Sequence, residues 1–206
     1  MQTLRHRRAA ALTVSLAVAG VLAGTVLPAQ AHSGHHGNRP TCRGQGVDRD
    51  ALIRYETDIV IDASLNTIWK LQTDVERWPS WQSPVLTSER VGHGPFRKGT
   101  QWVWTTPVPA TPTTPATTLD ITSTVQQVKN KKCLLWSGPA VGEGLRIDRG
   151  VHLWTFQKVK GGVRVHTEET WTGDQVEADI PTATEHLGMG LEAWLRELKA
   201  AAEARD

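Results

Sequence analysis

The sequence predicts an α+β domain in which a curved antiparallel sheet of about six to seven strands wraps around one long C-terminal helix. Runs with apolar residues at every second position recur between residues 52 and 172. A short helical pattern follows the first run, and a long amphipathic pattern closes the chain. A sheet and a helix that each have one apolar face bury those faces against each other in two layers.

Residues 1–31 have the layout of a secretory signal peptide. A basic start, MQTLRHRR, precedes a long apolar run that closes with the small residues Ala29 and Ala31. We therefore expect export by the general secretory or twin-arginine route, with cleavage after Ala31 and no stable membrane insertion afterwards. The alternative is an uncleaved anchor, because the apolar run reaches about the minimum length that spans a bilayer.

The charge of the chain after Ala31 is close to neutral. The removed segment holds three of the 23 Lys and Arg and none of the 21 Asp and Glu, which leaves a formal net charge of −1. Such a balance lacks the basic footprint of a nucleic-acid-binding domain, so nucleic acid is not an expected partner. The length fits one domain, residues 51–206, and carries no signal for an oligomeric state.

Residues 32–50 are polar and without periodicity, so we expect a flexible polar tail. His32, His35 and His36 could hold a metal ion, but a histidine-rich tail without partner carboxylates or cysteines is usually solvated. We therefore predict no metal site, and no motif in the chain indicates a cofactor.

Cys42 and Cys133 are the two cysteines of the chain. In an oxidising compartment they could form a disulfide that pins the tail to the domain. Alternatively, Cys133 is a small buried apolar residue and Cys42 is a free thiol.

The first strand is expected over residues 52–62, followed by a short helix with Ser64 as its N-cap. Pro79 ends that helix and places Trp78 and Trp81 on a short turn. We interpret Trp78 as a packing residue and Trp81 as a residue at the rim of a pocket.

Six further strands are expected over residues 85–91, 100–105, 117–128, 132–137, 150–159 and 163–172. Two loops separate some of them. Residues 106–117 contain four prolines, and residues 138–150 are glycine-rich but lack the ending that binds a nucleotide phosphate.

The C-terminal helix has one apolar face with helical spacing, and Pro181 lies in its first turn; the face consists of Leu187, Leu191, Trp194, Leu195 and Leu198. Gly188 and Gly190 are poor helix formers. Two glycines within one turn indicate the close approach of a strand or a ligand.

Particular residues in this order resemble the SRPBCC superfamily of polyketide cyclase/dehydrases and START-like lipid-transport proteins. They lie in VIDASLNTIWKLQTDVERWPSWQSPV and GMGLEAWLRELKAAAE, and the resemblance spans roughly residues 51–204. It implies a helix-grip fold and a small hydrophobic ligand held between the sheet and the helix. Together with the expected signal peptide, it indicates a secreted bacterial member of this superfamily. Fold membership alone assigns no reaction.

The last hairpin determines which side chains face that ligand. Gly161 and Gly162 suit a two-residue turn, which would pair Trp154 with Glu169, Phe156 with Thr167 and His152 with Trp171. One face then collects His152, Trp154, Phe156, Val163, Val165, Thr167, Glu169 and Trp171, and we predict that it is the inner face. A slip of one residue would exchange Glu169 for Glu168.

An inward carboxylate beside tryptophans has two interpretations. Glu169 could bind a polar group or act with His152 as an acid/base pair, since burial raises the pKa of a carboxyl group. Alternatively, it reaches water or is satisfied by His152, Thr167 or a tryptophan N–H. The predicted cavity residues are Trp81, Trp102, Trp104, Trp136, Trp154, Phe156, Thr167, Glu169, Trp171, Gly188 and Leu191.

Three functions remain open. The first is a secreted, non-catalytic binder of a lipid, polyketide or aromatic molecule, favoured by the indole-rich face and the absence of a nucleophile–base motif. The second is a cofactor-free cyclase or dehydratase that uses Glu169 and His152. The third is an envelope interaction module whose core is filled by the nine tryptophans.

Overall fold

The computed structural model describes residues 39–111 and 114–206. The expected signal peptide, residues 1–31, and residues 32–38 of the expected tail lie outside the described residues. Within the described part, no helix is both long and apolar enough to span a bilayer.

The described chain forms one seven-stranded antiparallel sheet with the strand order β1-β7-β6-β5-β4-β3-β2. The strands are β1 (Ile53–Ile61), β2 (Thr87–Val91), β3 (Gln101–Val108), β4 (Thr117–Lys129), β5 (Cys133–Gly142), β6 (Leu145–Val159) and β7 (Gly162–Thr172). The helices are α1 (Leu65–Thr73), the 3₁₀ helices η1 (Val75–Ser80) and η2 (Val176–Asp179), and α2 (Ile180–Glu203).

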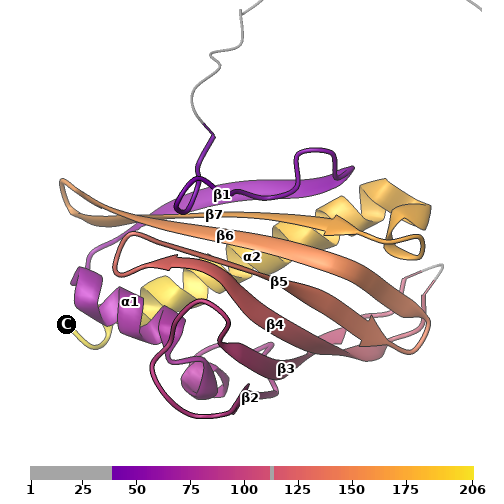
Figure 1. The fold of residues 1–206 in the computed structure, drawn as a ribbon, viewed down its shortest axis with the longest axis horizontal. Coiled ribbons are helices and arrows are strands. Elements are labelled where there is room, and N and C mark those ends of the chain that lie inside the picture. The colour runs from indigo at the N-terminus through magenta and orange to yellow at the C-terminus, as the bar shows by residue number, and fades with distance from the viewer. Residues whose placement is uncertain (1–38, 112–113) are drawn as a thin grey trace, which may run out of the picture. The chain divides into compact units, whose positions relative to one another are not determined.

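The helix α2 lies behind the sheet in the view of Figure 1, where the curved strands wrap around it. This confirms the predicted helix-grip fold, including the short helices after the first strand. Ser64 caps α1, accepting a hydrogen bond from the backbone N–H of Thr67 at 3.1 Å. Asp179 caps α2 in the same way through Thr182.

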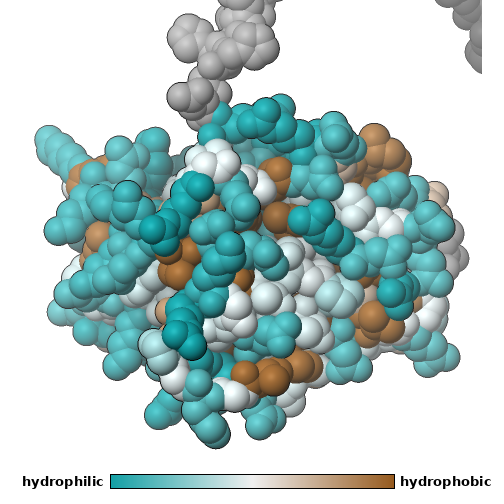
Figure 2. All heavy atoms as spheres, in the orientation of Figure 1, coloured by the Kyte–Doolittle hydropathy of each residue, from teal (hydrophilic) through white to brown (hydrophobic). Residues whose placement is uncertain are grey.

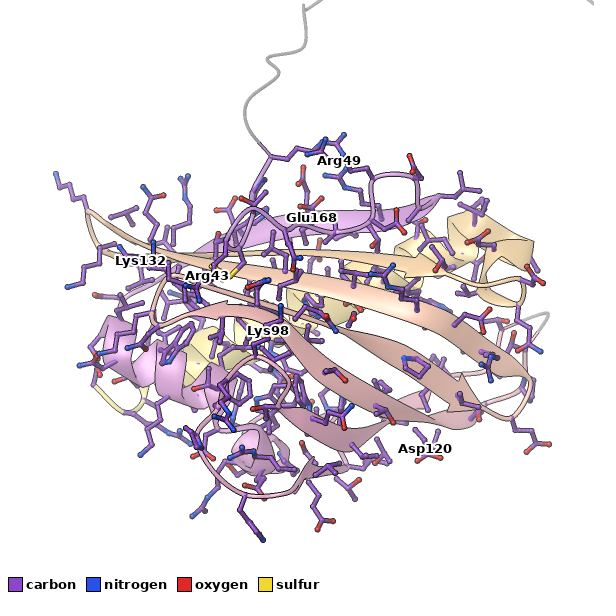
Figure 3. All side chains as sticks on the ribbon, in the orientation of Figure 1. Arg43, Arg49, Lys98, Asp120, Lys132 and Glu168 are labelled. Atoms are coloured by element: carbon purple, nitrogen blue, oxygen red, sulfur yellow. A yellow bond between two sulfur atoms is a disulfide. The ribbon has the colours of Figure 1, made fainter. Side chains whose placement is uncertain are left out.

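Residues 39–50 are packed on the outer face of the sheet, which differs from the expected flexible tail. Cys42 is fully buried and forms a disulfide with Cys133, visible beside Arg43 in Figure 3. The segment covers an apolar cluster that also contains Leu135, Val151 and Leu153. These outward apolar side chains need a cover, and the N-terminal segment supplies it. Around them, the outer face in Figure 2 is mainly hydrophilic.

The predicted loop over residues 138–150 is instead a continuation of the β5–β6 hairpin. Gly142 pairs with Leu145, and Ala140 pairs with Ile147, beyond a bulge near Gly138. Ala140 and Ile147 are both buried, so this extension of the hairpin contributes to the core.

The β6–β7 turn also differs from the prediction by one position. Val159 pairs with Gly162, so Lys160 and Gly161 form the turn. Gly162 belongs to the strand because a Cβ there would lie 2.0 Å from the backbone oxygen of Ile61 on β1. The shift changes each cross-strand pair but leaves every side chain on its predicted face.

Candidate functional site

A cavity of about 590 Å³ lies between the sheet and the N-terminal half of α2. Strands β3 to β7 form one wall, and η2 and α2 form the other. The apolar part of the lining includes Trp104, Leu119, Ile121, Trp136, Leu145, Ile147, Trp171, Leu187, Leu191 and Trp194. Its volume lies within the range of small-molecule sites.

A cluster of tryptophans fills the other part of the space between the sheet and the helix. Trp78 is fully buried at its centre, with ring centroids 4.9 Å from Trp194 and 5.7 Å from both Trp102 and Trp104. Trp136 and Trp154 continue the cluster with a centroid distance of 6.1 Å. The contacts of Trp78 with these three indoles are edge-to-face and that of Trp136 with Trp154 is stacked, and such contacts stabilise a rigid core. The cavity therefore ends at a tryptophan wall.

The opposite end of the cavity reaches the protein surface. The exposed residues that line it include Pro107 and Pro109 of the proline-rich segment, Gly144 at the tip of the β5–β6 hairpin, and Gln175 and Met189. A ligand entering between these segments would meet the tryptophan wall last.

Glu169 is the carboxyl group in the sheet wall of the cavity. Strand β7 presents it beside Trp171, whose indole Nε1–H donates to Glu169 Oε1 at 2.9 Å. Across the β6–β7 pair, Nδ1 of His152 lies 3.1 Å from Glu169 Oε2. Both oxygens therefore have a partner, as one sequence-based interpretation expected.

A third side chain extends this contact below the cavity wall. Nε2 of His152 lies 2.7 Å from Oγ1 of Thr167, which is fully buried. The hydroxyl, imidazole and carboxyl groups thus form one row of close polar contacts, hydrogen-bonded between Thr167 and His152, that ends at Glu169 in the cavity. Such contacts set the orientation of the imidazole ring.

Burial shifts the acidity of both titrating groups. It raises the pKa of Glu169 to about 7, an effect that the Trp171 N–H partly opposes. It lowers the pKa of His152 to about 3. At neutral pH the imidazole is therefore uncharged, and the carboxyl group exchanges between its protonated and ionised forms.

Five of the predicted cavity residues line the cavity: Trp104, Trp136, Glu169, Trp171 and Leu191. His152, the other predicted acid/base candidate, lines it as well. Trp102, Trp154 and Phe156 lie outside the lining because their part of the inner face belongs to the tryptophan cluster. Thr167 lies beneath His152 rather than on the cavity surface.

Trp81 packs against Trp194, with ring centroids 6.3 Å apart, instead of forming the expected rim. It caps the C-terminus of η1, which directs it into the tryptophan cluster. The residue of this turn that lines the cavity is Pro84.

The two glycines of α2 have different surroundings. A Cβ on Gly188 would lie 2.7 Å from Cε2 of Tyr55, so this glycine admits the close approach of strand β1. A Cβ on Gly190 would have no heavy atom within 4 Å, and Gly190 lines the cavity. Gly188 was predicted as a cavity residue but is a packing residue, which agrees with the alternative that a strand approaches this turn of the helix.

Several polar residues of the cavity were missed from the sequence. Ser123 accepts a hydrogen bond from Trp104 Nε1 at 3.0 Å, and Asp179 and His186 lie on the helical side. Alternation from Ile121 along β4 would have indicated Ser123. Asp179 and His186 could not be recognised as cavity residues from the sequence, because the sequence does not show which turns of η2 and α2 face the cavity.

The comparisons with known proteins agree with this architecture. The family model described as polyketide cyclase / dehydrase and lipid transport matches residues 53–203. No curated protein matches the chain in sequence.

Several solved structures are similar in fold. A START superfamily protein from Mycobacterium smegmatis is 12% identical, with a TM-score of 0.60, covering 74% of this chain and 99% of that one. TTHA0849 from Thermus thermophilus is 17% identical, with a TM-score of 0.55 and coverages of 75% and 98%. The di-domain ARO/CYC protein StfQ of the steffimycin biosynthetic pathway is 15% identical, with a TM-score of 0.56 and coverages of 74% and 52%.

At these identities the structural likeness shows the fold alone. The family match, however, covers most of the described chain, and the helix-grip architecture agrees with it. The chain belongs to the polyketide cyclase / dehydrase and lipid transport family.

Proposed function

We propose that this protein is exported and binds one small hydrophobic molecule in the cavity between the sheet and α2. The observation that carries the proposal is the cavity of about 590 Å³ itself, closed at one end by packed tryptophans and open at the other. A module without a ligand would gain stability by filling this space with side chains, because interiors pack densely. The disulfide agrees with an oxidising compartment.

The chemistry of the wall favours ligands with wide apolar surfaces. Trp104, Trp136, Trp171 and Trp194 present indole surfaces, while leucine and isoleucine line the rest of the apolar wall. Indoles suit flat ring systems or long acyl chains that carry few polar groups. Glu169 and His152 are positioned to meet the polar end of such a ligand.

Native mass spectrometry of the protein isolated from the medium of its own source organism tests the proposal. We expect a population carrying one extra small-molecule mass, which is lost on denaturation, on a polypeptide that begins at His32. Repeated isolation of an empty protein that also takes up no added hydrophobic molecule would contradict the binding function. A polypeptide that retains residues 1–31 would contradict cleavage.

A second candidate function is a cofactor-free cyclase or dehydratase. The contact between Glu169 and His152, with the carboxyl pKa near neutrality, favours it, because a general acid or base works best close to the ambient pH. The Glu169→Gln variant separates the two functions. Retained affinity with lost turnover of the bound molecule indicates catalysis, whereas a molecule that leaves the wild-type protein unchanged indicates binding alone.

A further inference from the structure

The wall of the cavity contains two carboxyl groups but no lysine or arginine among the described residues. Among the described residues that line it, the ionisable side chains are those of Glu169, Asp179, His152 and His186, and none is Lys or Arg. Arg146 lies between two lining residues in sequence, but the alternation of β6 directs it outward, where it pairs with Asp148 at 2.5 Å. No guanidinium or ammonium group of the described wall is therefore available to a bound anion.

The carboxyl group of Glu169 still has the capacity to accept a hydrogen bond from a ligand. Oε1 accepts a hydrogen bond from the indole N–H of Trp171, and Oε2 lies 3.1 Å from Nδ1 of His152, so each oxygen has one polar side-chain partner. A carboxylate oxygen accepts up to two hydrogen bonds. A ligand donor that reaches Glu169 would thus add to the existing contacts.

The neighbours of Glu169 do not offset its negative charge. His152 on β6 is uncharged at neutral pH because burial lowers its pKa to about 3. On β1, Tyr55 pairs directly with Glu169, and its hydroxyl donates to Glu192 of α2 at 2.5 Å. Tyr55 therefore contacts a second carboxylate, that of Glu192, and the cavity wall contains Asp179 as well.

Building on the proposed binding function, we propose that the cavity selects neutral or cationic hydrophobic molecules whose polar end carries an O–H or N–H donor. Anionic amphiphiles such as free fatty acids are excluded. The donor of the ligand binds Glu169, and the apolar body lies against Trp104, Trp136 and Trp171. An anionic head group would meet carboxylates in a partly enclosed apolar site without a lysine or arginine partner, which is strongly unfavourable.

A matched set of three pyrene probes tests this selectivity at pH 8. The probes 1-pyrenemethylamine, 1-pyrenemethanol and 1-pyreneacetic acid share one ring and present an ammonium, a hydroxyl and a carboxylate group. Affinity is measured by the quenching of indole fluorescence through energy transfer to pyrene. We expect the amine and the alcohol to bind at least about tenfold more tightly than the acid.

Two variants assign the selectivity to Glu169. Glu169→Gln keeps the shape of the side chain but removes its charge. We expect it to reduce the ratio of the amine affinity to the acid affinity by about threefold or more. Glu185→Gln removes an exposed charge from α2 at a position that does not line the cavity. We expect it to leave the ratio of the two affinities unchanged.

The outcomes separate the two proposals. If the acid binds as tightly as the amine, or if Glu169→Gln leaves the ratio of their affinities unchanged, the proposed charge selectivity is wrong while the binding function stands. If none of the three probes binds saturably to the wild-type protein, the binding function fails, and the selectivity fails with it.

Discussion

Nδ1 of His152 lies 3.1 Å from Oε2 of Glu169, across neighbouring strands and on the wall of an apolar cavity. The pair combines a carboxyl group whose pKa is raised with an imidazole whose pKa is lowered, and burial is the main cause of both shifts. These opposite shifts have a measurable consequence for stability.

The pH dependence of stability should change when Glu169 is neutralised. The folded state holds the Glu169 proton more tightly than the unfolded state, so this group lowers the free energy of unfolding as pH rises from about 4.5 to about 7. His152 has the opposite effect between about pH 3 and 6.5. In the shared window, about pH 4.5 to 6.5, the two slopes offset each other.

We therefore expect Glu169→Gln to reveal the contribution of His152 to the pH dependence of the free energy of unfolding. Its free energy of unfolding should rise across the shared window by roughly 1 kcal/mol per pH unit relative to the wild-type protein. Urea denaturation at a series of pH values measures this difference, with Glu185→Gln as the control. Parallel profiles for Glu169→Gln and wild type would show that Glu169 titrates normally.

Truncation at the centre of the tryptophan cluster should destabilise the fold. Trp78 is fully buried, contacts four other indoles, and donates from Nε1 to the backbone oxygen of Gln72 at 3.3 Å. Trp78→Ala should lower the free energy of unfolding by roughly 3–5 kcal/mol. Trp171 is half-buried in the cavity wall, so Trp171→Ala should lower the free energy of unfolding clearly less than Trp78→Ala. Chemical denaturation measures both losses. Equal losses would contradict the separation into a packed end and an open end.

Removal of the disulfide should weaken the attachment of residues 39–50. Cys42 and Cys133 are 91 residues apart, so chain-entropy reasoning gives at most about 4–5 kcal/mol of stabilisation. The double variant Cys42→Ser/Cys133→Ser should unfold at lower urea concentration than the oxidised wild type. A reductant should destabilise the wild type and leave the double variant unaffected. A wild-type protein insensitive to reductant would contradict the pairing.

The two glycines of α2 should respond in opposite directions to alanine. Gly190→Ala places a methyl group in open space and should stabilise the helix by up to about 1 kcal/mol. Gly188→Ala forces the methyl group to within 2.7 Å of the Tyr55 ring and should destabilise the protein despite the better helix propensity. Thermal unfolding of both variants measures the contrast, and a stabilised Gly188→Ala would show that Tyr55 moves aside freely.

Much of the fold and of the sheet wall could be predicted from the sequence because both depend on local periodicity. The alternation along β6 and β7 placed His152 and Glu169 on the inner face despite the wrong register. The register itself depends on the approach of Ile61 to Gly162, a tertiary contact that a two-residue turn pattern does not contain.

The boundary between the packed end and the cavity could not be predicted for a similar reason. Trp154 and Trp171 share one face, but only the positions of α1, η1 and α2 determine that the first is covered and the second borders a cavity. Trp81 was misplaced because the direction of a side chain at the end of η1 depends on the backbone of that turn. The packing of residues 39–50 required knowledge of the apolar cluster on the outer face.

The most direct test of the binding function compares two tryptophan substitutions on α2 in a titration with 1-pyrenemethanol. Ala183 lines the cavity, and Ala200 is exposed on the same helix outside it. We predict saturable quenching of indole fluorescence with one probe per protein for wild type and Ala200→Trp, and its loss in a folded Ala183→Trp variant. Unchanged affinity in Ala183→Trp would contradict the cavity as the binding site.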